Sequence, residues 1–513
     1  MSHADSFRQT ANFSTLIKMD DVIVRYAETG DFSKIQELLG KPHNIDSSLF
    51  EQAFQIAAGK GNTDIVTLLL PEKPYGFDPN ANNGYALMEA VKRQHIDTVL
   101  RILQDARVDP TVRNNTLLKM AAANGYTSIV DAILEKVDPS VSENYALRWA
   151  AAYGQTEIVK KLLQHPRVDP TVFNQFPLRA ASEHGQTEVV RLLLSYTHVN
   201  PSASNQYSLI KACKNGHTEV VRLLLGDRRV DPTVDENRPL LIAVETGHLD
   251  VLNLLAADPR VDIAENHNLP FRRACELGHL EIVRVLLANK QVDPTVDDQE
   301  GFRVSCAKGH KDVVSLLLTD ARIDPAAKTC EGLRKACQIG SIEIVAMLLA
   351  DLRVDPAAMD NFAIRMASKN GYASIVQSLL ADKRVNPADL ENEALEEACA
   401  GGFLEVVNLL FADPRVKANQ ECLMVAAKAG HKEVIQRLLE TPDVDPTLEI
   451  VQIATPAVRA ILFRDARLDP SLRDDERYLS PEEDKARQKQ AGGRNRRVTR
   501  KKQKKNKKLT PSV

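Results

Sequence analysis

Hydrophobic residues recur along most of the chain in a pattern that is fixed relative to one glycine. In the stretch LIKACKNGHTEVVRLLL, residues 209–225, apolar side chains stand four, five and eight positions after Gly216. This spacing places them on one face of a helix, because a helix turns every 3.6 residues whereas a strand alternates with a period of two. A large apolar residue seven positions before the glycine, with small residues three and four positions before it, predicts a second, shorter helix. Each unit is therefore predicted to contain a helix, a glycine turn and another helix.

The pattern is repeated in 14 units, nearly all of them 31 residues apart. Its anchor is a glycine in every unit except one. The anchors are Gly30, Gly61, Gln94, Gly125, Gly154, Gly185, Gly216, Gly247, Gly278, Gly309, Gly340, Gly371, Gly402 and Gly430. Between units the chain carries Val-Asp-Pro, as in residues 230–232, and proline holds the residue before it in an extended conformation and ends the helix. One unit cannot bury its own apolar stripes, so we expect neighbouring units to stack into a solenoid.

Polar residues at two positions are predicted to shape the ends of these helices. A Thr followed by an acid often precedes the second helix, as in Thr156 and Glu157, which predicts an N-cap and a first-turn carboxylate facing the helix dipole. An Asn or Gln stands ten residues before the anchor in ten units, where we expect it to cap the first helix and to bridge successive loops. These residues are Asn115, Asn144, Gln175, Gln206, Asn237, Asn268, Gln299, Asn361, Asn392 and Gln420.

The motif L-x-x-A-small-x-x-G-H-x-E-V-V-x-x-L-L in residues 209–225 resembles the ankyrin-repeat family. The resemblance covers roughly residues 20–470 and implies an all-α, ankyrin-type solenoid of stacked helix-turn-helix repeats, whose first helices line a concave, partner-binding face. The chain departs from the family because the T-P-L-H tetrapeptide is mostly absent and each unit is about two residues shorter. We therefore expect the helix pairs rather than the family's projecting β-hairpins. After Gly430 the pattern decays, and residues 455–465 are predicted to form a truncated last helix.

Charge divides the chain more sharply than the overall net charge of -3 suggests. Residues 485–513 hold 13 Lys or Arg and no acid, which leaves 66 − 13 = 53 basic residues against 69 acidic ones in the rest, a net charge of −16. Low hydrophobicity with one-sided charge predicts disorder. We therefore predict three parts, which are an N-terminal segment at 1–19, the ankyrin-repeat solenoid at 20–470 and a disordered, basic C-terminal tail at 471–513.

The basic cluster NRRVTRKKQKKNKK at residues 495–508 is typical of a nuclear or nucleolar address, and a nuclear import receptor is then a candidate partner. The candidate address residues are Arg496, Arg497, Arg500, Lys501, Lys502, Lys504, Lys505, Lys507 and Lys508. Two other interpretations stay open. One is nonspecific, salt-sensitive contact with nucleic-acid phosphates, because the cluster offers no aromatic ring for base stacking. The other is solvated charge, which pairs with the acidic body of the protein or with an anionic membrane.

Cysteine and histidine recur at fixed positions of the repeat and indicate packing rather than chemistry. Five of the seven cysteines stand three residues before the anchor, and these are Cys213, Cys275, Cys306, Cys337 and Cys399. Stacked helices lie too far apart for disulfides between these positions, so we expect small buried hydrophobes. Cys330 and Cys422 are isolated in the sequence, and the odd total favours a reducing compartment. The histidines that follow the anchors, such as His217, predict local hydrogen bonding at the turn.

Motifs of enzymes are absent from the sequence, including H-E-x-x-H, G-x-S-x-G and the Walker-type glycine loop. We therefore expect no catalytic residue, no metal and no cofactor. No segment approaches the roughly 18 apolar residues of a membrane span, and no secretory signal opens the chain. We expect a soluble, intracellular monomer without a membrane span, in the nucleus if the basic cluster is an address and otherwise in the cytoplasm.

A row of basic residues, termed the basic row, stands six residues before the anchor. Its members are Lys119, Arg148, Arg179, Arg272, Arg303, Arg334 and Arg365. By the resemblance, this position holds a His that helps to tie neighbouring units together, so one interpretation of the row is structural. The alternative is recognition, because guanidinium groups spaced along an acidic protein favour an acidic peptide through bidentate pairs.

Aromatic residues cluster in two adjacent units and are typical interface anchors, although Trp149 can equally serve packing. The cluster consists of Tyr145, Trp149, Tyr153, Phe173 and Phe176. Our hypothesis is that the cluster and the arginines form one elongated site on a non-enzymatic scaffold that binds a protein partner. Charge reversal of the last four arginines is then expected to abolish partner capture but not folding. The alternatives are a nucleic-acid-associated nuclear factor that uses the basic tail and a substrate adaptor for a modifying enzyme.

Overall fold

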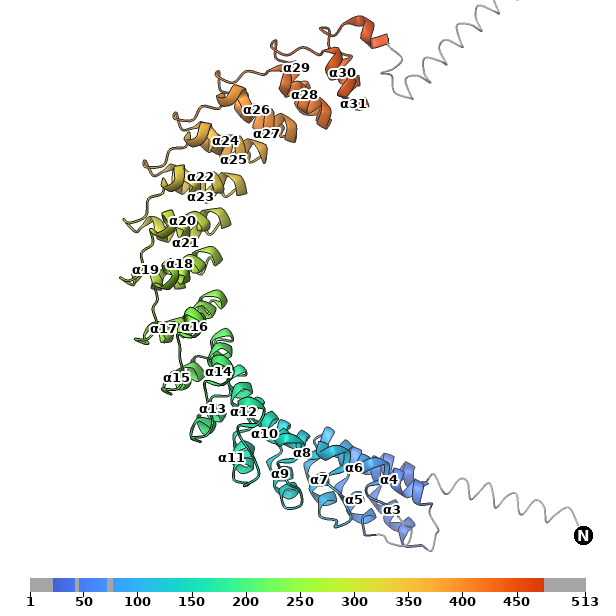
Figure 1. Ribbon diagram of the computed structural model, residues 1–513. Coiled ribbons are helices and arrows are strands. Elements are labelled where there is room, and N and C mark those ends of the chain that lie inside the picture. Colours follow the sequence, from blue (N-terminus) through green and yellow to red (C-terminus); the bar gives the residue numbers. More distant parts are fainter. Residues whose placement is uncertain (1–21, 42–45, 72–76, 475–513) are drawn as a thin grey trace, which may run out of the picture. The chain divides into compact units, whose positions relative to one another are not determined.

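The computed structural model describes residues 22–41, 46–71 and 77–474, and within these ranges it contains helices and no strand. Figure 1 shows the helices following one another in pairs along the chain. The first helices of the pairs are α2 (Val22–Thr29), α4 (Ser47–Lys60), α6 (Ala81–Lys92), α8 (Val112–Asn124), α10 (Val141–Ala152), α12 (Val172–Glu183), α14 (Ala203–Lys214), α16 (Val234–Thr246), α18 (Glu265–Leu277), α20 (Val296–Lys308), α22 (Ala327–Ile339), α24 (Ala358–Lys369), α26 (Asp389–Gly401), α28 (Gln420–Ala429) and α30 (Leu448–Ile453).

The second helices are shorter and are followed at the end by one 3-10 turn. They are α3 (Phe32–Leu39), α5 (Thr63–Leu69), α7 (Ile96–Leu103), α9 (Thr127–Leu134), α11 (Thr156–Leu163), α13 (Thr187–Leu194), α15 (Thr218–Leu225), α17 (Leu249–Ala256), α19 (Leu280–Ala288), α21 (Lys311–Leu318), α23 (Ile342–Leu349), α25 (Ala373–Leu380), α27 (Leu404–Phe411), α29 (Lys432–Leu439), α31 (Pro456–Leu462) and η1 (Pro470–Asp474). The predicted all-α fold and the truncated last helix are confirmed. The prediction about relative helix length was wrong, because most first helices are the longer ones.

The chain divides into two compact units, Met1–Glu265 and Asn266–Val513. Within the first unit, each first helix packs against the first helix of the next repeat, from α2 to α16. The same stacking runs from α20 to α30 within the second unit. Second helices also pack on one another, as α11, α13 and α15 do. The predicted solenoid stacking is therefore present inside each unit.

The core of each unit consists of the apolar positions that define the repeat. In α15, Val220, Val221 and Leu224 are at most 1% exposed, and Leu209 and Cys213 of α14 are fully buried beside them. This burial removes apolar surface from water at both helices of a repeat, which is the main favourable term in folding. The aliphatic core explains why 5% aromatic content suffices for so long a chain.

The anchor glycine is required by its backbone and by its neighbour in the next repeat. Gly185 has φ +70°, a left-handed conformation that glycine adopts without the steric cost of a side chain. A Cβ atom on Gly185 would lie 2.6 Å from Nδ1 of His217, which follows the next anchor. The His217 ring also hydrogen-bonds through Nε2 to the Glu183 carbonyl at 3.0 Å. The expected hydrogen bond is present at His217, but it joins two repeats rather than staying local to the turn.

The predicted N-cap of the second helices was wrong. Thr156 is the first residue of α11, and its hydroxyl donates to the Gly154 carbonyl at 3.4 Å. The cap residue is Gln155, whose amide donates to the Ala123 carbonyl of the previous repeat at 3.1 Å. The position after the anchor is therefore used to join repeats. The first-turn carboxylate was predicted correctly, because Glu157 lies in the first turn of α11.

A left-handed turn of three residues precedes the right-handed part of the first helix in eleven of the described repeats. The turns are residues 82–84, 113–115, 142–144, 173–175, 204–206, 235–237, 266–268, 297–299, 328–330, 359–361 and 390–392. Their φ angles lie between 48° and 72°, which costs an L-residue about 1–2 kcal/mol each. This turn was not predicted from the sequence pattern.

Except for Gln420, which begins α28, the Asn/Gln positions occupy the last residue of these left-handed turns, and several of them bridge to the next loop. Oδ1 of Asn144 accepts from the Asp169 amide at 3.2 Å, and Oδ1 of Asn361 accepts from the Asn386 amide at 2.8 Å. The predicted bridging of successive loops is confirmed at these positions. Asn also tolerates the left-handed conformation better than most residues, which suits it to this position.

Candidate partner-binding surface

The arginines of the basic row in the second compact unit hold the left-handed turns in place. In Arg303, Nε donates to the Asp298 carbonyl at 2.8 Å and a terminal nitrogen donates to the Asp297 carbonyl at 3.1 Å. The same two bonds, to the carbonyls five and six residues earlier, are made by Arg272, Arg334 and Arg365. Each guanidinium therefore satisfies carbonyls that the left-handed turn leaves without helical partners.

The other terminal nitrogen of these arginines reaches the next repeat, at the position nine residues before its anchor. Three arginines meet a carboxylate there, in the pairs Arg272–Glu300, Arg303–Glu331 and Arg365–Glu393. Arg334 meets Phe362 instead, and its guanidinium lies 5.5 Å from the ring centroid. The side chains of Arg303 and Arg365 are only 12% exposed. In the second unit the basic row thus joins consecutive repeats.

In the first compact unit the basic row meets aromatic rings at the same position. The Lys119 ammonium lies 4.8 Å from the Tyr145 ring centroid. Arg148 lies 5.6 Å from the Phe176 centroid, and Arg179 lies 4.9 Å from the Tyr207 centroid. A cation over an aromatic face is attracted by the ring quadrupole, but the ring supplies no opposite charge. The three cations of the first unit therefore differ in kind from the carboxylate-paired arginines of the second.

The arginines of the first unit also form fewer hydrogen bonds to their turn than the arginines of the second unit do. Arg148 and Arg179 each donate one bond to a carbonyl of their turn, at 3.3 Å in both cases. The Nε atoms of both side chains are buried and have no hydrogen-bond partner among the described residues. Within that same part of the chain, Lys119, Arg148 and Arg179 form no ion pair with a carboxylate. Their positive charge is therefore less compensated than that of Arg272, Arg303 and Arg365.

An aromatic groove lies beside these cations, between α8 and α10. Tyr145, Trp149 and Tyr153 stand four residues apart along α10 and its C-terminal end, with ring centroids 5.7 Å and 5.8 Å apart. Facing them, α8 contributes Lys119 and Met120 to a cavity of about 610 Å³. Tyr153 is 56% exposed, although it is a large aromatic residue. The structure thus brings Trp149 of the predicted site together with Lys119 in one concave surface.

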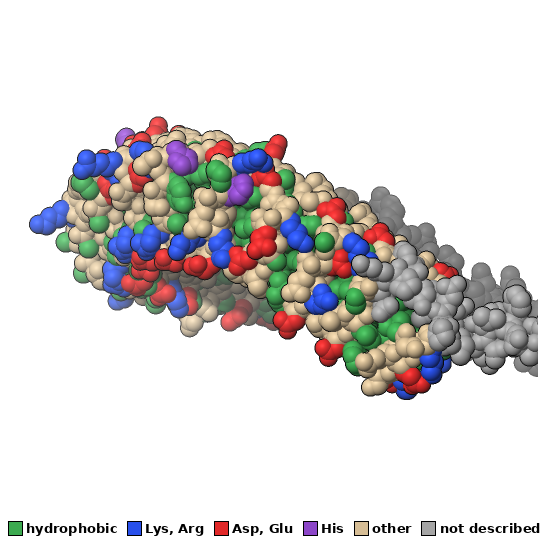
Figure 2. All heavy atoms as spheres, turned by 90° about the horizontal axis from the view of Figure 1, so that it is seen from below, with side chains coloured by type: hydrophobic (Ala, Val, Ile, Leu, Met, Phe, Trp, Pro, Cys, Tyr) green, Lys and Arg blue, Asp and Glu red, His purple; other side chains and the backbone are tan. Residues whose placement is uncertain are grey.

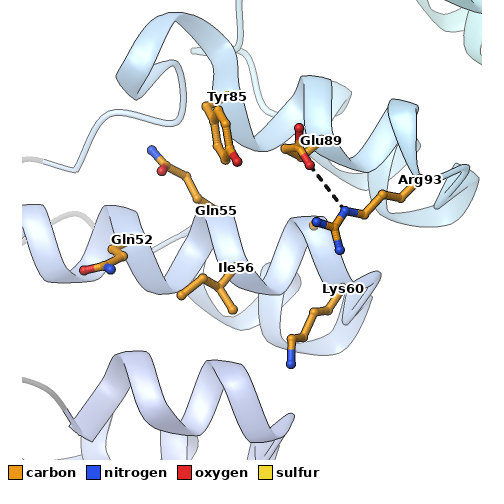
Figure 3. Close-up of a pocket in the computed structure, with 8 residues that line it drawn as sticks. Gln52, Gln55, Ile56, Lys60, Tyr85, Glu89 and Arg93 are labelled. Atoms are coloured by element: carbon orange, nitrogen blue, oxygen red, sulfur yellow. Dashed lines mark hydrogen bonds and ion pairs between the residues drawn. The ribbon is translucent and has the colours of Figure 1, made fainter. Parts of the chain in front are cut away.

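A second groove occupies the equivalent position between α4 and α6. Its cavity of about 370 Å³ is lined by Gln55 and Ile56 on one side and by Tyr85 and Glu89 on the other. Figure 3 shows these side chains facing one another across the groove, together with the ion pair between Glu89 and Arg93 at 3.3 Å. Of its two cations, Arg93 is paired with Glu89, and Lys60 donates to the Glu28 carbonyl at 2.6 Å. The groove between α8 and α10 is larger than the groove between α4 and α6. It is lined by three aromatic side chains, whereas the smaller groove is lined by Tyr85 alone among aromatic residues.

Acidic and basic side chains lie next to one another over the molecular face drawn in Figure 2. This arrangement agrees with the many ion pairs between neighbouring residues and repeats. A cation that is paired with a neighbouring carboxylate is less available to a partner. The pairing of each cation therefore matters more for recognition than the overall net charge.

Ion pairs in the loops between repeats were missed by the sequence analysis. In most loops an Asp and an Arg two residues later form a bidentate pair, and the Arg also reaches the previous repeat. Arg322 binds Asp320 at 2.7 Å and donates to the Val292 carbonyl at 3.0 Å. The Arg322 guanidinium lowers the pKa of Asp320 below its ordinary value. The recurring D-x-R-V-D-P sequence was the signal that this pairing exists.

The cysteines are buried and free, as expected for small core residues. The seven are Cys213, Cys275, Cys306, Cys330, Cys337, Cys399 and Cys422. Burial raises the pKa of Cys275 to about 12, which keeps its thiol protonated at neutral pH. Cys422, which is isolated in the sequence, hydrogen-bonds through its side chain with Cys399 of the previous repeat. That bond, together with burial, raises the pKa of Cys399.

Other predicted features concern metal ions, membrane spans and the two ends of the chain. Within the described ranges, no group of three or more His, Cys, Asp or Glu residues is arranged to hold a metal ion. None of the helices described is long and apolar enough to cross a membrane. The N-terminal segment 1–19 and the nine candidate address residues of the tail lie outside the described residues. The predicted address and the predicted three-part division stay predictions.

Comparison with known families agrees with the repeat geometry. The model for ankyrin repeats (3 copies) matches residues 23–114, 118–205, 195–267 and 364–450, which is more than half of the chain. The chain belongs to the ankyrin-repeat family. Ankyrin repeats generally mediate protein–protein interactions and are typically not enzymes. No curated protein matches the chain.

Proposed function

We propose that the protein is a non-enzymatic interaction scaffold that captures a protein partner in the aromatic groove between α8 and α10. The observation that carries this proposal is the stack of Tyr145, Trp149 and Tyr153 in an open cavity. Tyr and Trp are enriched among residues that dominate binding energy, because they bury a large area with few rotatable bonds. A 56% exposed Tyr153 gains from burial by a partner.

The groove replaces the elongated site expected from the sequence as the place of recognition. Arg272, Arg303 and Arg365 already have carboxylate partners in the next repeat. A partner peptide would have to break these ion pairs before it could bind the guanidinium groups, so they are poor recognition residues. We therefore assign structural roles to these arginines and recognition to Lys119, Trp149 and Tyr153.

The other hypotheses from the sequence stay predictions. The nuclear factor depends on the basic tail, which lies outside the described residues. The adaptor requires a segment that recruits a modifying enzyme, and the monomeric state requires a measurement of mass in solution. The nuclear-factor and adaptor hypotheses concern other parts of the chain, and a monomer can carry the groove, so all three are compatible with a partner-binding groove.

Affinity capture with full-length protein tests the proposal. We expect the Trp149→Ala, Tyr153→Ala double variant to lose a partner that the unaltered chain retains, while the circular dichroism melting curve changes little. The matched control is Leu352→Ala, which removes an 89% exposed apolar side chain from a loop of the second unit. Equal capture by the unaltered chain and the double variant would place recognition elsewhere.

A further inference from the structure

The basic row contains two kinds of cation that the sequence does not distinguish. In the second unit, the position nine residues before the next anchor is Glu in three of the four pairs. In the first unit the same position is Tyr145 for Lys119, Phe176 for Arg148 and Tyr207 for Arg179. The first unit therefore presents three uncompensated cations in three consecutive repeats.

These cations lie where an ion pair with a carboxylate of a ligand would be strong. Each is half-buried and close to aromatic rings, which lowers the local dielectric and strengthens an ion pair. Arg148 is flanked by Phe173 at 4.6 Å and Tyr145 at 5.3 Å. A half-buried guanidinium without a carboxylate partner gains more from an anion than a solvated surface arginine does.

The spacing between the cations indicates the conformation of the ligand. Packed first helices are about 8–10 Å apart, whereas a chain in the extended polyproline II conformation rises about 3.1 Å per residue and brings every third side chain to the same face. One cation per repeat therefore matches one acidic side chain at about every third residue of an extended peptide. The aromatic groove beside Lys119 then receives an apolar or aromatic side chain of the same peptide.

We infer that the partner segment is an extended acidic peptide, with carboxylates at about every third residue that pair with Lys119, Arg148 and Arg179. This inference rests on the proposed function, because it places the peptide across the aromatic groove. A peptide is favoured over nucleic acid because residues 1–484 carry a net charge of −16. That charge repels a polyanion over its whole length, but it opposes a short peptide with three paired carboxylates far less.

Peptide selection on the full-length protein tests the inference. The probe is a library of random peptides of about 12 residues, roughly twice the length needed to span the three cations. Peptides that bind the unaltered chain but not the Trp149→Ala, Tyr153→Ala variant are sequenced. We expect Asp or Glu to be enriched at three-residue intervals beside an apolar residue. Groove-dependent peptides without acidic enrichment would overturn the inference and leave the proposed function intact. Failure to obtain any groove-dependent peptide would count against both.

Variants that each remove one positive charge then test which cations bind the peptide. Lys119→Gln and Arg179→Gln should each weaken a selected peptide by about tenfold in fluorescence anisotropy. Lys160→Gln, which removes an exposed lysine from α11 of the same unit, should leave its affinity unchanged. Arg179→Lys keeps the charge and should retain most of the affinity, which separates loss of charge from loss of folding. Equal affinities for all of these variants would refute the assignment. An oligouridylate that binds more tightly than the peptide, and depends on Arg179, would favour nucleic acid instead.

Discussion

At the scale of single residues, the partner across the repeat boundary decides what a basic residue does. Arg303 and Arg148 occupy the same position of the repeat, yet one meets Glu331 and the other meets Phe176. The sequence could predict the row, because its spacing is constant. It could not assign the roles, because the contact joins residues 28 positions apart through a turn that was not predicted.

Arg303 should therefore stabilise the fold. We expect Arg303→Met to lower the free energy of unfolding by about 1–3 kcal/mol, because it removes hydrogen bonds to two carbonyls and an ion pair that is mostly buried. The measurement is urea unfolding of Arg303→Met, Glu331→Met and the double variant. A coupling energy near zero between the two positions would contradict an ion pair that stabilises the repeat.

The anchor position gives a second residue-scale prediction. Gly185→Ala should destabilise the protein by about 1–2 kcal/mol, because Ala is strained at φ +70° and its Cβ would clash with His217. Gln94→Gly is the matched control, since Gln94 holds the same conformation at φ 65° with a side chain. It should be neutral or stabilising by up to about 1 kcal/mol. Thermal unfolding of both variants tests the pair, and destabilisation by Gln94→Gly would be the contrary result.

At the scale of elements, the sequence predicts the helices well and their connections poorly. The apolar positions around each glycine are sufficient for the helix pairs, because they depend on local periodicity. The left-handed turns are stabilised by contacts with residues outside the turn, such as the bonds that Arg303 donates to its turn and the bond that Asn361 accepts from the next loop. Local propensity alone opposes three consecutive left-handed residues, so the turn could not be read from its own sequence.

The loops between repeats give the fold a dependence on acid. Arg lowers the pKa of its Asp partner at several loops, below the ordinary value of 3.8. These carboxylates are Asp227, Asp258, Asp320, Asp351, Asp382 and Asp413. The stability that they contribute is complete above the unfolded-state value of about 4 and is lost as the pH falls through the lowered native values.

Urea midpoints between pH 7 and pH 2 measure this dependence. We expect the midpoint to fall below about pH 4, and Asp320→Asn to reduce the size of that fall. Asp109→Asn is the control, because this exposed loop aspartate accepts hydrogen bonds from Thr111 without an arginine partner in the described ranges. An identical pH profile for Asp320→Asn and the unaltered chain would argue against the loop ion pairs.

At the scale of the whole molecule, the proposed recognition surface and the basic tail are separate parts of the chain. The groove lies in the first compact unit, whereas the 13 basic residues of 485–513 lie outside the described ranges. The sequence alone could locate the tail from its composition. It could not locate the groove, because Lys119 and Trp149 come from different repeats and only their packing forms a cavity.

Deletion of residues 485–508 tests this separation. We expect the shortened chain to keep its affinity for a groove-binding peptide and to lose any binding to RNA or DNA that is present at low salt. Phosphate contacts release counterions, so the binding of the full chain to nucleic acid should fall steeply between about 50 and 200 mM salt. Loss of peptide binding on deletion, measured by anisotropy at both salt concentrations, would show that the tail belongs to the recognition site.

The emission of Trp149 tests the central claim most directly, because it is the only tryptophan in the chain and lies in the proposed groove. A tryptophan-free peptide from the selection is titrated into the full-length protein. We predict a saturable shift of the emission, with the same midpoint as the binding isotherm from calorimetry, because the peptide displaces water from the indole. A peptide that binds by calorimetry and leaves the emission of Trp149 unchanged would contradict the claim that the groove between α8 and α10 captures the partner.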